Sequence, residues 1–247
     1  MKKSGKVRID VLLVERGFTR SRQRAQALIM AGRVTVGGVV IDKAGTPVDP
    51  EGEVGIKEEL PFVSRGGLKL EGALDGFGID VKELTVMDVG SSTGGFTDCL
   101  LKRGAARVFA VDVGRGLMDY GLRSDERVHL LEGRNIRHLS EEEVGEKVDL
   151  AVIDVSFISL MKVIPKVKEF LKPRGRVLAL VKPQFEVGRK EVGKGGIVKD
   201  PAKHRAAVDG IKAFSEAEGF RVLGETESPI RGAKGNREFW LYLCLEG

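Results

Sequence analysis

The chain has 247 residues, of which 42% are hydrophobic and 31% charged, a composition typical of globular proteins with a buried core. No apolar run approaches the roughly 18 residues of a membrane span. No apolar stretch follows the basic N-terminus, so we expect neither a transmembrane helix nor a secretory signal. The two cysteines and three histidines show no disulfide or metal-ligand spacing. We therefore expect a cytoplasmic protein that binds no metal.

The net charge of +5 is unevenly distributed. Residues 1–34 hold nine Lys or Arg and two acidic residues, a charge of +7, whereas the rest of the chain sums to −2. A basic end on a near-neutral body is typical of proteins that bind a polyanion such as a nucleic acid. A solvated helix face can have the same charge density, so charge alone leaves both interpretations open.

Short elements with frequent turns are expected over the first sixty residues. Apolar residues at helical spacing predict a helix over 7–16 and a second one over 21–31, each followed or ended by a glycine. Two short apolar runs within 34–41, separated by two glycines, predict a hairpin. A further short strand is expected around 53–57.

This pattern resembles the S4 RNA-binding module, which occurs in a small-subunit ribosomal protein, in pseudouridine synthases and in tyrosyl-tRNA synthetase. The resemblance covers about residues 6–60 and rests on Arg20-Ser21-Arg22-x-Arg24-Ala25 and Ala31-Gly32-Arg33-Val34-x-Val36. It implies contacts with the phosphates of folded RNA, which is recognised by its shape more than by its sequence. The arginines expected to make these contacts are Arg8, Arg20, Arg22, Arg24 and Arg33, with Arg65 just beyond the module.

Pro61 marks the expected boundary between two domains, residues 1–60 and 61–247, with a linker at about 58–64. Beyond it, a helix over 66–77 precedes alternating strands and helices. The expected strands are 84–89, 107–112, 128–131, 148–154, 176–181, 221–227 and 238–245, and the longer helices between them are 95–103, 159–171 and 201–218. This alternation predicts an α/β fold with a mostly parallel seven-stranded sheet covered on both faces. The last loop is too short for a helical crossover, so the final strand should run antiparallel, as in Rossmann-like methyltransferases.

A glycine-rich loop follows the first of these strands. It reads Gly90-Ser91-Ser92-Thr93-Gly94-Gly95-Phe96, which is not the dinucleotide pattern G-x-G-x-x-G. Asp112 ends the next strand 22 residues beyond Gly90, where a carboxylate can accept the ribose hydroxyls of a nucleoside. A tight turn would explain the loop alone, and it is a weaker explanation of the loop together with Asp112. The residues expected to bind S-adenosylmethionine are Asp88 (at its amino acid part), Gly90, Ser91, Ser92, Gly94, Gly95, Phe96, Asp112, Asn135 (at its adenine) and Asp154.

Asp154 and Lys182 each close an apolar run that is typical of a buried strand. Burying a charge costs several kcal/mol unless the charge is paired or used. Parallel strands place functional residues at their carboxyl ends, so both residues are candidates for a catalytic centre. Taken alone, Lys69 is more simply a solvent-facing helix residue, and Glu238 could protect a sheet edge.

Five segments together resemble the FtsJ-type RNA 2′-O-methyltransferases: 64–70, 88–96, 152–157, 180–185 and 235–239. With the N-terminal module, essentially the whole chain resembles the TlyA family of hemolysin-named rRNA methyltransferases. The resemblance implies methyl transfer from S-adenosylmethionine to a ribose 2′-hydroxyl, that of a cytidine, in ribosomal RNA or ribosomal subunits. It also implies a catalytic tetrad of Lys69, Asp154, Lys182 and Glu238. Whether Lys182 removes the proton of the hydroxyl or only orients it stays open at this point.

Two other functions remain as alternatives. The chain could be a non-catalytic RNA-binding protein on a methyltransferase fold, although the intact loop, Asp112 and the four tetrad positions argue against this. The hemolysin name of the family suggests a membrane-active protein. That function predicts an amphipathic or apolar membrane segment, and none is visible in the sequence.

Overall fold

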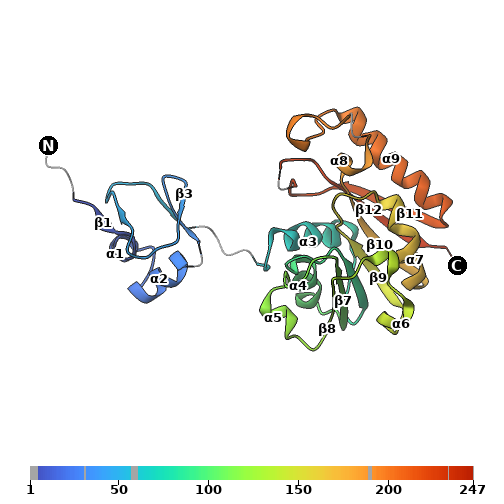
Figure 1. Ribbon diagram of the computed structural model, residues 1–247, viewed down its shortest axis with the longest axis horizontal. Helices are drawn as coiled ribbons and strands as arrows, with labels where there is room; N and C mark the ends of the chain where they lie inside the picture. Colours follow the sequence, from blue (N-terminus) through green and yellow to red (C-terminus); the bar gives the residue numbers. More distant parts are fainter. Residues whose placement is uncertain (1–4, 31, 57–60, 189–190, 233, 247) are drawn as a thin grey trace. The chain divides into compact units, whose positions relative to one another are not determined.

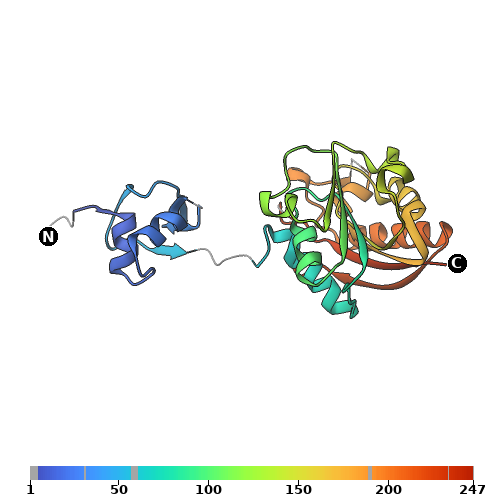
Figure 2. The ribbon, with the colours of Figure 1, turned by 90° about the horizontal axis from the view of Figure 1, so that it is seen from below.

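The computed structural model describes residues 5–30, 32–56, 61–188, 191–232 and 234–246 (Figure 1, Figure 2). The chain divides into two compact units, Met1–Glu59 and Leu60–Gly247. Each unit has a hydrophobic core of its own. The expected linker at 58–64 overlaps residues 57–60, which lie outside the described part of the chain.

The first unit is a small α+β module. Its helices α1 (Ile9–Glu15) and α2 (Arg22–Met30) share one apolar core with a three-stranded sheet of order β3-β2-β5. The strands are β2 (Val34–Val36), β3 (Val39–Ile41) and β5 (Val54–Ile56). The hairpin between β2 and β3 turns at two glycines with positive φ, as the two-residue turn of such a hairpin requires.

The chain enters this module as a strand, and the expectation of a helix from residue 7 is wrong in that detail. Strand β1 (Val7–Arg8) pairs antiparallel with β4 (Pro47–Val48), and α1 begins only at Ile9. The helical spacing of apolar residues is a local signal. Here a strand partner far along the sequence overrides it for the first two residues.

The described strands of the second unit form a seven-stranded sheet of order β11-β12-β10-β9-β6-β7-β8. Neighbours from β10 to β8 are parallel, and β12 is antiparallel to both β10 and β11. The predicted fold with a mostly parallel sheet and an antiparallel last strand is thereby confirmed. The strands are β6 (Thr85–Val89), β7 (Arg107–Asp112), β8 (Val128–Glu132), β9 (Val148–Ile153), β10 (Leu171–Val181), β11 (Phe220–Glu227) and β12 (Phe239–Leu245).

Helices cover both faces of this sheet (Figure 1). On one face, α3 (Arg65–Phe77) and α4 (Gly95–Lys102) bury their apolar sides in one core. On the other face, α7 (Ile164–Phe170) and α9 (Pro201–Ala217) contribute to a second core. The parallel strands run in the same direction, so their carboxyl ends lie together at one end of the sheet. In α/β proteins, ligands bind at this end.

Short helices and 3₁₀ turns occupy the connections of the described chain. They are α5 (Tyr120–Arg123), α6 (Glu141–Val144), α8 (Pro183–Glu186), η1 (Ile136–His138), η2 (Leu160–Lys162) and η4 (Lys194–Gly196). The single helix expected over 159–171 is split into η2 and α7. Pro165 lies at the start of α7, where its missing N–H is tolerated, whereas it would break a continuous helix. None of the described helices is both long and apolar enough to cross a bilayer.

Candidate active site

The glycine-rich loop joins β6 to α4 and is packed too tightly for side chains at two of its glycines. Gly90 has a φ of 91°, and a Cβ atom there would overlap the backbone carbonyl of Asp154. Gly94 has a φ of 92° and caps α4, and a Cβ atom there would collide with Met118 and Leu122. Any other residue would be strained at these positive φ values, and at Gly90 it would also overlap backbone atoms. The loop is therefore a fixed cradle at the end of the first parallel strand.

Two neighbouring cavities open beside this loop. The larger, of about 1030 Å³, extends over the ends of β6, β7 and β9. The smaller, of about 230 Å³, lies between the loop and the start of α3. Gly90, Ser92 and Asp154 line both cavities, so the two spaces meet at the end of β9. A ligand that extends along the sheet edge could occupy both.

Several residues predicted to bind the cofactor line these cavities. Asp112 ends β7 in the larger cavity, and its two carboxylate oxygens accept the N–H groups of Ser92 (2.8 Å) and Gly114 (2.7 Å). Asn135 lies in the same cavity after β8, with its side-chain oxygen on the N–H of Arg137 (3.2 Å). Ser91 lines the smaller cavity, and its buried hydroxyl has no described hydrogen-bond partner. An extra polar ligand could satisfy that hydroxyl. Gly95 and Phe96 also line the smaller cavity.

Asp88 does not reach either cavity. It shares with Val86 the face of β6 that α4 covers, because side chains alternate along a strand. Its carboxylate is fully buried and accepts the hydroxyl of Thr97 (2.7 Å). Burial raises the pKa of Asp88 to about 7. The structure therefore places Asp88 beneath the loop, as a support of the cradle, and not beside a ligand.

The four charged residues singled out in the sequence form two ion pairs at one end of the sheet. Val181 pairs with Phe239 in the antiparallel register of β10 and β12, so Lys182 and Glu238 follow opposite each other. Lys182 forms an ion pair with Asp154, which directly follows the neighbouring strand β9. Lys69, on α3, donates a hydrogen bond of 2.6 Å to Glu238. The fold thus brings together residues that are up to 169 positions apart.

Both ion pairs are mostly withdrawn from solvent. The side-chain exposure is 10% for Lys182, 19% for Asp154, 12% for Lys69 and 3% for Glu238. The Lys182 ammonium also donates to the hydroxyl of Ser156 (3.1 Å). Lys69 and Asp154 line the smaller cavity, and Asp154 lines the larger one as well. A substrate group that reached the junction of the cavities would therefore meet partly desolvated charges, whose fields are stronger than in water.

Asn236 holds the segment before Glu238 and was not recognised from the sequence. Its side-chain oxygen accepts the N–H of Val198 (3.0 Å), and its amide nitrogen donates to the carbonyl of Gly196 (2.9 Å). It thereby ties the chain that follows α8 to the chain that leads into β12. The only signal in the sequence was its place within the Gly235–Phe239 segment, two residues before Glu238.

Phe157 is a second residue that sequence reasoning missed. The residue is 88% exposed at the larger cavity, and its φ of 64° is unusual for a residue other than glycine. The centroid of its ring lies 5.0 Å from that of Phe185, which lines the same cavity. An exposed aromatic pair at a cavity offers a stacking surface for a nucleobase. Strained backbone of this kind is often found at functional sites.

Arg65, which was predicted to contact RNA, lines the smaller cavity. A second arginine, Arg231, which was not predicted to lie there, lines it as well. Arg65 is the first residue of α3, and its guanidinium donates to the carbonyl of Arg231 (3.2 Å). Together with Lys69, these arginines outnumber Asp154 among the charged residues that line this cavity.

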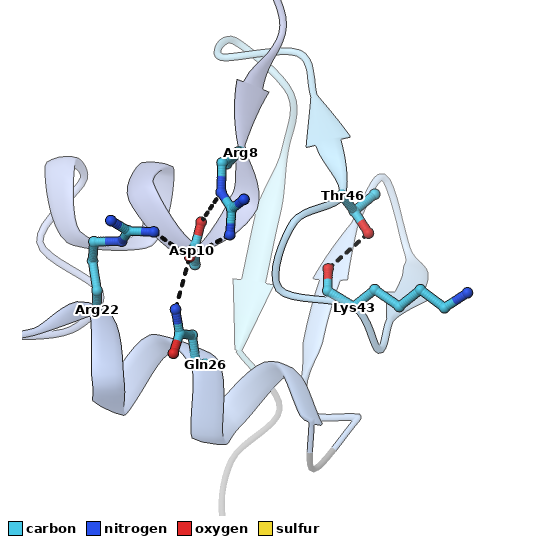
Figure 3. A network of polar contacts seen from close by, with 6 residues as sticks. All are labelled: Arg8, Asp10, Arg22, Gln26, Lys43 and Thr46. Atoms are coloured by element: carbon cyan, nitrogen blue, oxygen red, sulfur yellow. Dashed lines mark hydrogen bonds and ion pairs between the residues drawn. The ribbon is translucent and has the colours of Figure 1, made fainter.

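The arginines predicted in the N-terminal module lie on several of its elements. Arg8, on β1, and Arg22, on α2, both contact the buried carboxylate of Asp10 (Figure 3). Arg20 and Arg24 are exposed, whereas Arg33 is half-buried beside β2. In the sequence, Asp10 is only one of two acidic residues among the basic residues of 1–34. Nothing there indicates its central position in this cluster. In the described part of the chain, no three His, Cys, Asp or Glu side chains are grouped so that they could hold a metal ion.

The comparisons with known proteins agree with this architecture. The sequence pattern of the FtsJ-like methyltransferases matches residues 62–245, and that of the S4 domain matches residues 7–54. YqxC of Bacillus subtilis (strain 168) is 47% identical over 99% of this chain and 88% of its own length. The 16S/23S rRNA (cytidine-2′-O)-methyltransferase TlyA of Mycobacterium tuberculosis (strain ATCC 25618 / H37Rv) is 43% identical over 96% of this chain and 90% of its own length.

A solved structure from Streptococcus thermophilus is 42% identical and has a TM-score of 0.76, with 98% of this chain and 90% of that one covered. The fold and the site define a Rossmann-like methyltransferase. More narrowly, the chain belongs to the FtsJ-like methyltransferases with an N-terminal S4 domain, the family of TlyA.

Proposed function

We propose that this protein transfers a methyl group from S-adenosylmethionine to the ribose 2′-hydroxyl of a cytidine in ribosomal RNA. The observation that carries the proposal is the junction of the two cavities, where the Lys182–Asp154 and Lys69–Glu238 pairs adjoin the glycine-rich loop. The 43% identity to an enzyme named for this reaction supports the same activity and the same nucleoside. An enzyme of ribosomal RNA would act in the cytoplasm.

The residues around the cavities fit S-adenosylmethionine. Asp112 can accept the ribose hydroxyls, as the acidic residue at the end of the second strand does in nucleotide-binding α/β proteins. Asn135, in the larger cavity, would contact the adenine, and the glycine loop with the unpartnered Ser91 hydroxyl would hold the amino acid end. When bound, this cofactor supplies an electrophilic methyl group.

The Lys182–Asp154 pair can prepare the target hydroxyl. A ribose 2′-hydroxyl is a poor nucleophile, and the proton that it loses as its oxygen attacks can pass to the Asp154 carboxylate, which lines both cavities. A lysine ammonium has three N–H donors, and Lys182 directs its contacts to Asp154 and Ser156. One donor therefore remains to orient the hydroxyl oxygen and to stabilise the negative charge that develops on it. This contact pattern favours an orienting and electrostatic role for Lys182.

Ribose methylation of ribosomal subunits tests the proposal. The protein, labelled S-adenosylmethionine and isolated ribosomal subunits should yield a methylated ribose that can be mapped in the rRNA. Lys182→Ala should lower kcat by at least about 100-fold, the usual effect of removing a donor that stabilises developing charge. Its affinity for S-adenosylmethionine should stay within about twofold of the parent.

Lys172→Ala is the matched control, because Lys172 lies near the opposite end of β10 and pairs with Asp149. It should methylate at the parental rate. A parental rate in Lys182→Ala would refute the role given to this lysine, and the absence of methylation in every rRNA would refute the enzyme assignment.

A further inference from the structure

A carboxylate is buried in the N-terminal module at the meeting point of three elements. Asp10, on α1, has no exposed surface. It accepts two hydrogen bonds from Arg8 on β1 (3.0 Å each) and one from Arg22 on α2 (2.9 Å). The amide of Gln26, one turn further along α2, donates a fourth (3.0 Å). Figure 3 shows these side chains converging on the carboxylate from three sides.

This arrangement keeps Asp10 charged. Burial alone would favour the neutral acid. The hydrogen bonds from Arg8, with smaller contributions from Gln26 and Arg22, instead hold the pKa of Asp10 well below its usual range. A buried charge is tolerated only when it is paired and hydrogen-bonded in this way. The same hydrogen bonds that stabilise the Asp10 carboxylate also hold the two guanidinium groups beside it.

Arg8 and Arg22 have N–H donors that are left for another anion. Their side chains are 53% and 55% exposed, although their partner is fully buried. A guanidinium has five N–H donors, of which Asp10 takes two from Arg8 and one from Arg22. A surface arginine normally loses rotamer entropy when it is immobilised. Here Asp10 has already imposed much of that order.

We propose that Asp10 is a positioning residue that holds Arg8 and Arg22 ready to receive phosphates of folded ribosomal RNA. This inference rests on the proposed function for the identity of the polyanion. It can be tested separately from that function, because positioning and net charge predict opposite changes in RNA binding when Asp10 is neutralised. Asp10 subtracts one unit from the positive charge of the module, so its neutralisation should strengthen binding if only net charge matters. A positioning role predicts the opposite, because the two guanidinium groups lose their common anchor.

Binding of the full-length chain to isolated ribosomal subunits, measured by co-sedimentation without S-adenosylmethionine, tests this prediction. Asp10→Asn keeps the shape of the side chain and removes its charge. We expect it to weaken binding about tenfold, which corresponds to about 1.4 kcal/mol. Asp42→Asn adds the same unit of charge at an exposed position after β3, and it should bind as tightly as the parent or more tightly.

A mutant cycle separates positioning from a loss of folding. In the Arg8→Ala/Arg22→Ala background, Asp10→Asn should weaken binding no further, because the groups that it positions are gone and a neutral amide is easier to bury than an unpaired carboxylate. In an Arg20→Ala background it should still cost about tenfold, because Arg20 is not among the contacts of Asp10. An undiminished loss in the double-alanine background would mean that the module unfolds, and would overturn the proposal.

Two further results would overturn it. One is parental or tighter binding by Asp10→Asn, and the other is parental binding by Arg8→Ala/Arg22→Ala. Methyl transfer gives an independent readout, since a positioning role raises the KM for subunits and leaves kcat unchanged. If the parent methylates nothing, the proposed reaction fails while the binding comparison still decides the role of Asp10.

Discussion

Glu238 is the most deeply buried of the four charged side chains at the end of the sheet, with 3% of its surface exposed. Its partner is the ammonium of Lys69. Removing one partner of a buried ion pair leaves an uncompensated charge, whereas replacing both can be nearly neutral for stability. Stability and catalysis can therefore be separated at this pair.

Lys69→Met should lower the free energy of unfolding by about 3–5 kcal/mol, because Glu238 is left charged and unpaired. Lys69→Met/Glu238→Gln should recover part of that loss, yet both variants should be impaired in methyl transfer. Urea unfolding followed by the fluorescence of Trp240, the single tryptophan of the chain, reports on the unit that holds the pair. Parental activity in the double variant would show that the pair is structural only.

Asp88 gives a prediction about pH. Its pKa is raised to about 7 by burial, so the folded protein keeps it protonated at pH values where the unfolded chain has already released the proton. Below the ordinary pKa of an aspartate, both states are protonated and the group has no effect on stability. As the pH rises from there through 7, the folded state progressively loses stability.

Asp88→Asn removes this titration while it can keep the hydrogen bond from Thr97. The unfolding free energy of Asp88→Asn minus that of the parent should therefore increase between pH 5 and pH 8. Urea unfolding at pH 5, 6.5 and 8 measures this difference. A difference that stays constant or decreases over this range would contradict the proposed burial of a protonated carboxyl.

At the scale of elements, the loop between β6 and α4 depends on contacts with the end of β9. Gly90 lies against the backbone carbonyl of Asp154, and the N–H of Asp154 donates to the carbonyl of Val89 (2.9 Å). The glycine-rich loop and the strand end beside Asp154 are therefore coupled through these contacts. A substitution in the loop should therefore displace the end of β9, and a substitution at the end of β9 should displace the loop.

Gly90→Ala should reduce the affinity for S-adenosylmethionine by more than tenfold, by roughly 1–3 kcal/mol of backbone strain and an added clash with Asp154. Isothermal titration calorimetry measures this affinity. Gly145→Ala is the matched control, because Gly145 also has a positive φ (81°) but open space at its Cβ position. It should lose stability and keep parental affinity. Equal losses of affinity in the two variants would refute the steric argument.

At the scale of the whole molecule, the two units differ in charge and in chemistry. Residues 1–34 hold the excess positive charge, whereas the cavities lie in the second unit. Binding of ribosomal RNA should therefore depend strongly on salt through the first unit, because each phosphate contact releases counterions. Binding of S-adenosylmethionine should not share this dependence.

Arg20→Ala should reduce the slope of log affinity against log salt concentration by about 0.7 to 0.9, the value for one lost phosphate contact. Arg221, an exposed arginine on β11, provides the control, and Arg221→Ala should leave the slope unchanged. Titration of isolated ribosomal subunits at several salt concentrations measures both slopes. Identical slopes for Arg20→Ala and the parent would exclude a phosphate contact by Arg20.

The amino-acid sequence by itself determined the order and type of nearly all the longer elements. Buried strands contain apolar runs, and the ends of these runs are visible where a charge follows, as at Asp154 and Lys182. The glycine loop was predictable for the same reason, since the need for positive φ selects glycine locally at Gly90 and Gly94. These signals lie within a few residues of the feature that they predict.

Only the tertiary structure decided which side chains meet. The Lys69–Glu238 pair depends on the register of β12 and on the position of α3. The burial of Asp88 depends on which face of β6 lies under α4. The Asp10 cluster joins β1, α1 and α2. Such contacts are set by strand order and packing over long separations in the chain, for which local periodicity carries no information. The sequence thus determined where the chemistry-bearing residues stand on their elements, and the fold decided which of them act together.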